Sequence, residues 1–404
     1  MRSAVIVDAV RSPMAKGRAA KDDRPGGALS ELHPVELLAQ TIKGLMDRND
    51  VDPGEVEDVM IGCVSQVGEQ GGPAGRWAWL GAGFPEHVPA TTIDRRCGSS
   101  QQAADFAAQG VMCGTYDIVV AGGIESMSRV PMFTARMGRD IYGESVNDRY
   151  APGLVPQGIS AELIAARWGL TRHELDVFSA RSHDRAAATA DGGGFDREIV
   201  PITVTQPDGT STVVDRDETI RRGTTVEGLG ELRAVFESDE MSERFPEIGW
   251  SVTAGNSSQL SDGAAAMLIM SEDRCAQLGL TPRARFHAFA VASDDPITML
   301  SGPIPATEKI LARTGMSLDD IDHYEINEAF APVPLAWRKH FDADLERINP
   351  RGGAIALGHP LGASGARLMV TMLEAMESSG SRYGLQTMCE AGGMANATIL
   401  ERLS

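Results

Sequence analysis

The sequence predicts an α/β protein built from two similar halves. Short apolar runs bounded by glycines alternate with longer helical stretches along the 404 residues, an order typical of strands and helices that share one fold. Residues 97–123 and 358–393 also repeat each other in outline, because each runs from a Gly/Ser-rich helix start through a helix and a strand to a Gly-Gly turn. This repetition indicates a duplicated α/β unit whose two active-site edges face each other.

Local patterns predict the individual elements. Strands are expected at five apolar runs, residues 1–10, 56–64, 116–121, 321–326 and 385–389. Helix starts are expected at Asp52, Thr171 and Ser317, where an acid three residues further on lies near the positive end of the helix. The second of these helices extends to about residue 190. Residues 253–258 (T-A-G-N-S-S) predict a polar turn, and we expect a helix of small residues after it.

The middle of the chain differs from both ends. Residues 126–249 are irregular and rich in glycine, proline and charge, with the helix at 171–190 as their one clear element. Long irregular stretches inside a regular pattern are typical of insertions that carry binding loops. The sequence therefore predicts a lobe inserted between two regular halves.

Composition excludes several classes of protein. The 37 Lys and Arg against 56 Asp and Glu give a net charge of −19, which opposes binding to nucleic acid, so an anionic ligand needs a local basic patch. The longest apolar run, Ala264–Met270, is far shorter than the roughly 18 residues of a membrane span, and the N-terminus lacks the pattern of a signal peptide. No nucleotide-binding glycine motif, no nucleophile-elbow motif and no metal-ligand spacing occurs, so we expect no resident cofactor and no metal. The odd set of unpaired cysteines favours a reducing cytoplasm, namely Cys63, Cys97, Cys113, Cys275 and Cys389.

Four residues could carry chemistry. Cys97 precedes a helix-forming run at 101–109, and a helix N-terminus favours the thiolate, which would make the sulfur a nucleophile; a small buried core residue is the alternative. His359 lies in a turn with five glycines among fourteen residues, where it is either a base acting on a thiol or a structural histidine. Cys389 and Asn327 each lie at the end of an expected strand, where α/β folds bind ligands. Taken alone, Cys389 is better explained by simple burial, and the Asn327–Glu328 pair either holds a water or, as the simpler explanation, caps a helix.

The motifs around these residues resemble the thiolase family, specifically the acetyl-CoA acyltransferases. The motifs are C-G-S at 97–99, N-E-A-F at 327–330, G-G-A-I-A-L-G-H-P at 352–360, and Cys389 with its Gly-Gly tail. They occur in the family's order and span nearly the whole chain. The resemblance implies a five-layered α-β-α-β-α fold of two duplicated halves with an inserted loop domain. It places the first half at residues 1–125 plus 250–276, a CoA-binding loop domain at 126–249 and the second half at 277–404.

The resemblance also implies roles for the site residues. Cys97 is the nucleophile, His359 is its activating base, Cys389 is the second acid/base, and Asn327 holds a catalytic water. Two oxyanion holes follow, one from His359 with that water and one from the backbone N–H groups of Cys97 and Ala391. The implied partners are CoA and acyl-CoA as substrates and a second copy of the chain, in a homodimer or homotetramer.

Two further positions resemble the family's CoA contacts. Ser258 matches a serine near the pantetheine, and Arg221 matches an arginine near the adenine nucleotide. A local cation of this kind would let an acidic protein hold an anionic substrate. A turn serine and an exposed arginine are the alternatives.

Several positions depart from the commoner family pattern. Arg96 stands where a neutral residue is usual, Ser100 replaces a frequent glycine, and Ala391 replaces a glycine, which keeps its N–H available provided that its φ is negative. Pro156 and Gln157 replace a His-Met pair of the short-chain biosynthetic enzymes.

The departure at Pro156 and Gln157 favours a degradative 3-ketoacyl-CoA thiolase that acts on a longer or bulkier acyl chain, including a steroid-derived one. A biosynthetic enzyme that makes acetoacetyl-CoA is a second possibility, since the same residues catalyse the reverse reaction. A third, from another class, is a non-catalytic acyl-CoA binding protein on the same scaffold, suggested by Arg96 and Ala391.

Overall fold

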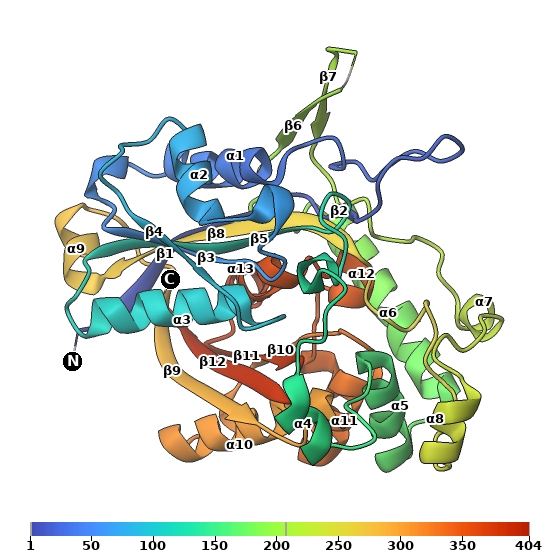
Figure 1. Ribbon diagram of the computed structural model, residues 1–404. Coiled ribbons are helices and arrows are strands. Elements are labelled where there is room, and N and C mark those ends of the chain that lie inside the picture. The colour runs from blue at the N-terminus through green and yellow to red at the C-terminus, as the bar shows by residue number, and fades with distance from the viewer. Residues whose placement is uncertain (1, 207, 404) are drawn as a thin grey trace.

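The computed structural model describes residues 2–206 and 208–403, which form five layers (Figure 1). The strands of the first half follow the order β4-β3-β5-β8-β1, and those of the second half follow β10-β11-β12-β9. The first set comprises β1 (Ala4–Arg11), β3 (Asp58–Gly62), β4 (Ala90–Ile93), β5 (Ile118–Ser126) and β8 (Ser261–Ser271), with the short β2 (Ala15–Lys16) paired to β8. The second comprises β9 (Ala284–Ser293), β10 (His323–Ile326), β11 (Tyr383–Glu390) and β12 (Met394–Arg402).

The two half-sheets have the same topology. In each, a parallel pair (β3 with β5, β10 with β11) is followed by two antiparallel neighbours (β8 and β1, β12 and β9). They join only where β1 meets β9, at the pairs Val5–Arg285 and Ile6–Ala284. The predicted duplication is therefore confirmed as a repeated order of strands.

Helices form the other three layers (Figure 1). α1 (Pro34–Asp47) and α2 (Ala74–Gly81) pack on the outer face of the first half-sheet, and α10 (Pro303–Thr314) and α11 (Pro332–Phe341) pack on the outer face of the second. α3 (Ser99–Met112) and α13 (Ser364–Ser379) lie between the half-sheets and contact strands of both. Small residues of α3, such as Ala104 and Ala108, are fully buried there. This close packing brings the first turns of α3 and α13 together.

The segment between β5 and β8 lies at one side of these layers (Figure 1). Its helices are α4 (Gly143–Arg149), α5 (Gln157–Arg167), α6 (Arg172–Asp191), α7 (Val226–Gly230) and α8 (Asp239–Arg244), and its strands β6 (Ile202–Thr205) and β7 (Ser211–Val214) form a projecting hairpin. Two further short helices lie outside this segment, α9 (Glu272–Gln277) and α12 (Ala354–Leu357). The predicted boundaries of the CoA-binding loop domain stay a prediction.

Two local predictions are wrong. Asp52 and Ser317 do cap helical turns, but each turn is a single 3-10 turn, Pro53–Glu55 and Leu318–Asp320, because a strand begins a few residues later. The helix expected after residues 253–258 is instead β8, whose apolar residues point alternately to the cores on its two faces. A continuous apolar run is typical of a strand buried on both sides. The capped helix at Thr171 is confirmed as α6, which begins with a full capping box.

Candidate active site

Cys97 lies in a tight turn immediately before α3. The residue before it, Arg96, has a φ of 50°, and the residue after it, Gly98, is the N-cap of the helix. Ser99 holds the turn closed, because its Oγ accepts the Arg95 N–H at 2.9 Å and donates to the Arg96 carbonyl at 2.5 Å. Positive φ is costly for a residue with a side chain, so the turn is held by its surroundings. It leaves the Cys97 side chain only 4% exposed.

His359 lies in the corresponding turn before α13. Gly358 precedes it with a φ of 89°, and a Cβ there would lie 2.3 Å from Ser261 Oγ, so only glycine fits. The His359 N–H donates to the Gln259 carbonyl at 3.1 Å. The glycine-rich sequence therefore lets the backbone pass close to the start of β8 and present the imidazole inward.

The hydrogen bonds of His359 determine its tautomer. Its Nδ1 lies 2.6 Å from Ser364 Oγ, and that hydroxyl donates its one hydrogen to the Pro360 carbonyl at 2.8 Å. With that hydrogen on the Pro360 carbonyl, we assign the His359 proton to Nδ1, which donates to Ser364 and leaves a lone pair on Nε2. Nε2 is buried and has no hydrogen-bond partner among the described residues. Burial, reinforced by the charge of Arg367, lowers the pKa of His359 to about 3, so the imidazole is neutral and able to accept a proton.

Cys389 and Asn327 come from neighbouring parallel strands. β10 and β11 pair up to Ile326 and Thr387, and the Asn327 N–H donates to the Thr387 carbonyl at 3.1 Å. Both side chains are buried. The Asn327 amide lies beside the Cys389 thiol and favours its thiolate, but neither amide atom makes a regular hydrogen bond to a described residue. A buried amide with unused donors and acceptors is suited to hold a water or a substrate oxygen.

The turns before α3 and α13 meet at the centre of the molecule. The Ala366 N–H donates to Ser100 Oγ at 2.9 Å, and a Cβ on Gly365 would lie 2.3 Å from the Gln101 nitrogen. Cys97 packs against Leu368 of α13 and against Met388, the neighbour of Cys389 in β11. The structure thus brings the Cys97, His359 and Cys389 segments together, as the duplicated pattern predicts.

Electrostatics correct one prediction about Cys97. The helix N-terminus was expected to lower its pKa, but burial raises the pKa of Cys97 to about 12, and any negative charge on Glu390 adds to that rise. The pKa of Cys389 is raised well above its ordinary value, again mainly by burial. Loss of hydration costs the thiolate more than the helix end returns. Both sulfurs are thiols in the free protein, and Cys97 needs a base to become a nucleophile.

The three remaining predicted residues lie around this centre. The Ser258 N–H donates to the Ala329 carbonyl at 2.9 Å, which places Ser258 against the segment that carries Asn327. Arg221 is exposed and donates to the Gln259 side chain at 3.2 Å. The Gln259 carbonyl accepts the His359 N–H, so Gln259 connects the exposed Arg221 side chain to the backbone of His359. Ala391 is not among the residues with positive φ, which meets the backbone condition set for it, and its oxyanion role stays a prediction.

Several residues that shape the site were missed. Ser364 orients His359, Gln259 joins the Arg221 and His359 segments, and Glu125 accepts the Gly362 N–H at 2.9 Å. Glu328 caps a helix, which was the alternative role suggested for the Asn327–Glu328 pair. Its carboxyl group accepts the Ile355 N–H at the start of α12. Only the glycine-rich segment that contains both His359 and Ser364 gave any signal, because the other three contacts join segments distant in the chain.

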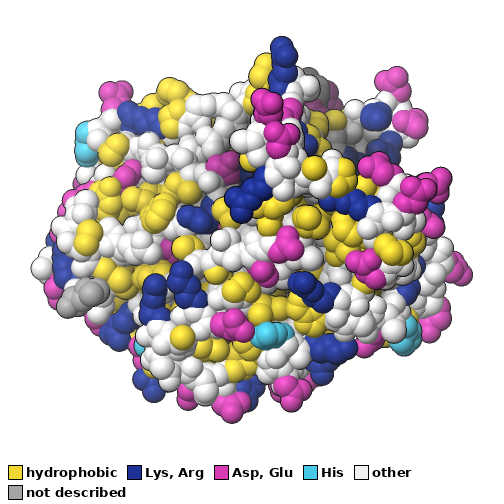
Figure 2. Space-filling model, turned by 60° about the horizontal axis from the view of Figure 1, so that its bottom comes forward, with side chains coloured by type: hydrophobic (Ala, Val, Ile, Leu, Met, Phe, Trp, Pro, Cys, Tyr) yellow, Lys and Arg dark blue, Asp and Glu magenta, His cyan; other side chains and the backbone are white. Residues whose placement is uncertain are grey.

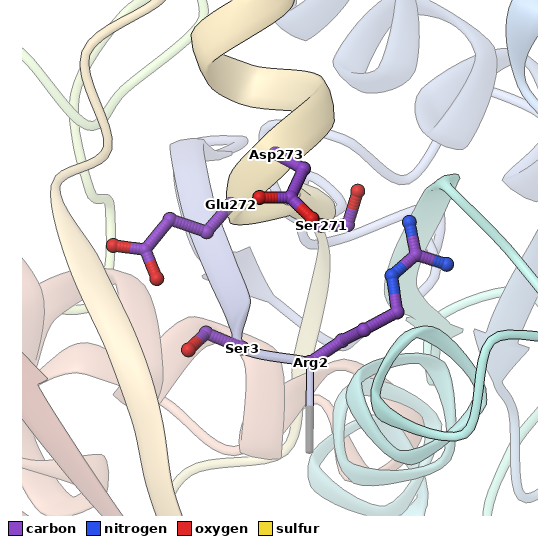
Figure 3. Close-up of a pocket in the computed structure, with 5 residues that line it drawn as sticks. All are labelled: Arg2, Ser3, Ser271, Glu272 and Asp273. Atoms are coloured by element: carbon purple, nitrogen blue, oxygen red, sulfur yellow. The ribbon is translucent and has the colours of Figure 1, made fainter.

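The surface of the described chain adds little to the site. Figure 2 shows one face, on which Lys and Arg side chains are interspersed with Asp and Glu among the residues drawn in colour. One cavity of about 380 Å³ (Figure 3) is lined by Arg2, Ser3, Ser271, Glu272 and Asp273, none of which is a predicted site residue. Within residues 2–206 and 208–403, no helix is long and apolar enough to cross a membrane. The same residues contain no cluster of three or more His, Cys, Asp or Glu side chains that could hold a metal ion.

A buried thiol that adjoins the turn of a neutral imidazole is the arrangement required for covalent catalysis by a cysteine. Residues 4–273 match the thiolase N-terminal domain, and residues 280–402 match the thiolase C-terminal domain. The chain therefore belongs to the thiolase family.

Named relatives agree over the full length of the chain. The steroid 3-ketoacyl-CoA thiolase FadA6 of Mycobacterium tuberculosis is 46% identical over 411 residues, covering 100% of this chain and 95% of that protein. A 3-ketoacyl-CoA thiolase of Idiomarina loihiensis is 45% identical, with 100% of both chains covered. The crystal structure of the Bacillus anthracis acetyl-CoA acetyltransferase has a TM-score of 0.88 at 37% identity, covering 100% of this chain and 99% of that one. The predicted fold and family are confirmed.

Proposed function

We propose that this protein is a degradative 3-ketoacyl-CoA thiolase. It cleaves a 3-ketoacyl-CoA with free CoA to acetyl-CoA, or to propionyl-CoA from a branched substrate, and a shortened acyl-CoA. One observation carries the proposal: a neutral His359 with a buried, unpartnered Nε2 lies in a turn whose Leu361 packs against the cluster that contains the buried Cys97. The relatives named 3-ketoacyl-CoA thiolase support it.

In the first half of the reaction, Cys97 attacks the C3 ketone of the substrate. Its proton passes to His359 Nε2, which the Nδ1 bond to Ser364 leaves unprotonated. The C2–C3 bond then breaks, and its electron pair becomes the enolate of acetyl-CoA. Cys389 protonates C2, acetyl-CoA leaves, and the shortened acyl group remains on the Cys97 sulfur as a thioester.

The second half transfers that acyl group to CoA. The proton held by His359 first replaces the one that Cys389 lost, which makes the imidazole neutral again. His359 then takes the thiol proton of the incoming CoA, whose sulfur attacks the thioester carbonyl. The Cys97 thiolate leaves and regains its proton from His359, so each cycle returns the enzyme to its starting state by a ping-pong scheme.

Two sets of donors stabilise the negative oxygens of this scheme. The protonated His359 and a water on Asn327 hold the enolate oxygen, and the unused amide atoms of Asn327 support that role. The backbone N–H groups of Cys97 and Ala391 hold the oxyanion of the tetrahedral intermediates. Donors that are already in place when charge develops lower the barrier without reorganisation of the site.

Arg221 and Ser258 are the proposed contacts of CoA, which acts as a substrate; no resident cofactor is proposed. Arg221 is exposed beside Gln259, where its charge can attract a phosphate despite the acidic balance of the chain. Ser258 lies nearer the centre, against the segment of Asn327, as a contact of the pantetheine must.

Degradation of a long or bulky acyl chain is favoured over synthesis of acetoacetyl-CoA. Pro156 forms the N-cap of α5 where the short-chain enzymes have another residue, and the steroid thiolase is 46% identical. The acetyltransferase title of the Bacillus anthracis structure, at lower identity, keeps synthesis as the second candidate. The arrangement around His359 argues against a mere binding protein, which would need no activating base.

We propose that the enzyme acts in the cytoplasm as a homodimer or homotetramer in fatty-acid or steroid breakdown. Its five cysteines are all free, which suits a reducing compartment. Exposed apolar side chains on the segment around α4, including Phe133 and Met137, support association with a second copy. Size-exclusion chromatography with light scattering measures the oligomer.

CoA-dependent cleavage tests the function directly. Purified protein is incubated with CoA and either acetoacetyl-CoA or a long-chain 3-ketoacyl-CoA, with Cys97→Ala as the control. The proposal expects cleavage that is lost in the variant and a higher kcat/KM for the longer substrate. A preference for acetoacetyl-CoA would indicate the biosynthetic enzyme. Absence of cleavage with intact CoA binding would indicate a binding protein.

A further inference from the structure

Glu390 follows Cys389 directly and has no part in the proposed reaction. It ends β11 with no exposed surface, and its carboxyl group reaches the turn of the nucleophile. A Cβ on Gly98 would lie 1.9 Å from Glu390 Oε1, so glycine is required at position 98 to accommodate this carboxyl group. Glu390 thus fills the space behind the first turn of α3.

The carboxyl group of Glu390 has no regular partner. Neither oxygen accepts a hydrogen bond of ordinary geometry from a described residue, although the Asn396 backbone N–H is near enough to favour ionisation, and no ion pair of the described residues includes Glu390. The charged groups that face it are Arg95, which favours its ionisation, and Asp94 and Asp105, which oppose it. A buried carboxylate without a donor or a paired cation is strongly destabilising.

A second buried oxygen without a hydrogen-bond donor, Asn396 Oδ1, lies beside the same turn. The Asn396 Nδ2 donates to Gln102 Oε1 at 3.1 Å and to Asp105 Oδ2 at 3.2 Å, while Thr398 donates to Asp105 Oδ1 at 2.8 Å. These acceptors favour this orientation of the amide, because the reverse orientation would place Asn396 Oδ1 against the assigned oxygens of Gln102 and Asp105. Asn396 Oδ1 is consequently directed elsewhere, buried and without a donor, and it lies 3.1 Å from the same Gly98 Cβ position as the Glu390 carboxyl.

A single proton on the Glu390 carboxyl group would give both unpartnered oxygens a hydrogen bond. We propose that Glu390 is a positioning residue for the nucleophile, held as an uncharged carboxylic acid that donates its O–H to Asn396 Oδ1. The pair fixes the Cys97–Gly98 turn against β12 and keeps negative charge away from the sulfur. Burial, which raises the pKa of Glu390 well above its ordinary value, agrees with this state. The inference rests on the proposed function only in taking Cys97 as the nucleophile.

Loss of the Glu390 proton also limits the reactivity of Cys97 at high pH. Ionised Glu390 would repel the Cys97 thiolate and, at the end of β11, the Cys389 thiolate. Arg95 is a cation that favours ionisation of Glu390, but no ion pair of the described residues joins the two, so Arg95 cannot cancel that repulsion fully. The rate at which Cys97 reacts should therefore fall below its expected rise at high pH, once Glu390 loses its proton.

Alkylation of Cys97 by iodoacetamide, followed by peptide mass spectrometry across pH, tests the proposal without any acyl-CoA. Glu390→Gln keeps an N–H donor for Asn396, so its alkylation rate at neutral pH should lie within about twofold of the wild type and keep rising at high pH. Glu390→Ala leaves Asn396 Oδ1 unpaired, so thiolysis by that variant should fall by about tenfold. Glu401→Gln, on the adjoining strand β12, is the matched control, because Glu401 instead pairs with Arg382.

Two results would overturn the proposal. Faster Cys97 alkylation in Glu390→Gln at neutral pH would mean that Glu390 is an anion in the wild type. Absence of a protonated-carboxyl C=O band in the wild-type minus Glu390→Gln infrared difference spectrum would mean the same, and this measurement does not require the alanine variant to fold. Wild-type protein without thiolysis but with the expected alkylation profile would contradict the proposed function and leave this inference standing.

Discussion

Replacement of Ser364 by alanine tests the role of the His359 tautomer. The Ser364 hydroxyl is the only described acceptor of the Nδ1 proton, at 2.6 Å, in a site where His359 is 5% exposed. A buried N–H without an acceptor costs about 1–3 kcal/mol. This penalty falls on the tautomer that leaves Nε2 free, and each ~1.4 kcal/mol is a tenfold change in population. We therefore expect kcat to fall about 5- to 150-fold, with KM for the acyl-CoA within about twofold of the wild type.

The assay is steady-state thiolysis of a 3-ketoacyl-CoA by Ser364→Ala beside Ser379→Ala. Ser379 ends the same helix, and its hydroxyl donates to the Ala375 carbonyl at 2.8 Å, far along α13 from His359. The control should keep wild-type kcat. Equal kcat in the two variants, with equal melting temperatures, would show that Ser364 does not set the tautomer and that the base is selected in another way.

The remaining predictions concern His359 and the surface of the CoA site. His359→Ala should slow iodoacetamide alkylation of Cys97 by about 100-fold, because the buried thiol loses its base, while the exposed Cys113 in the same sample keeps its rate; an equal rate at Cys97 would exclude His359 as the base. Because the pKa of His359 is held at about 3 instead of 6.5, the unfolded chain binds more protons between these values, so the wild type should lose stability as pH falls through that window. His359→Asn should lose less, as urea midpoints at about pH 7 and about pH 4 would show. Arg221→Ala should raise KM for CoA about two- to fivefold, less so at high salt, whereas Arg222→Ala, whose side chain pairs with Asp191, should not change it.

Much of the fold could be predicted because its signals are local. The apolar runs at β3, β5, β10 and β11 and the capping box at Thr171 each specify an element through neighbouring residues. β8 was mistaken for a helix because a run of small apolar residues lacks a period. Its environment, a strand with neighbours on both sides and a core on each face, comes from segments far away in the sequence.

The same distinction separates the predicted from the missed parts of the site. Cys97 and His359 could be predicted from neighbouring residues, namely the helix start that follows Cys97 and the glycines around His359. Glu125 contacts Gly362 across 237 positions of the chain, and Asn396 contacts Gln102 across 294 positions. Contacts between residues so far apart in the chain leave no pattern among neighbouring residues, so they could not be predicted. The ionisation of Cys97 was also mispredicted, since a helix end is visible in the sequence whereas burial between two half-sheets is not.

The distribution of unused hydrogen-bonding groups explains how reacting groups without charge can perform this chemistry. The free protein holds two thiols and a neutral imidazole, so none of these three groups has to be stabilised as an ion before the substrate arrives. The buried groups left without partners include His359 Nε2 and both amide atoms of Asn327. In the proposed reaction these are the atoms that receive the first proton and hold the enolate oxygen. Leaving them unpaired destabilises the free protein, but that capacity is used in the transition state, where it lowers the barrier.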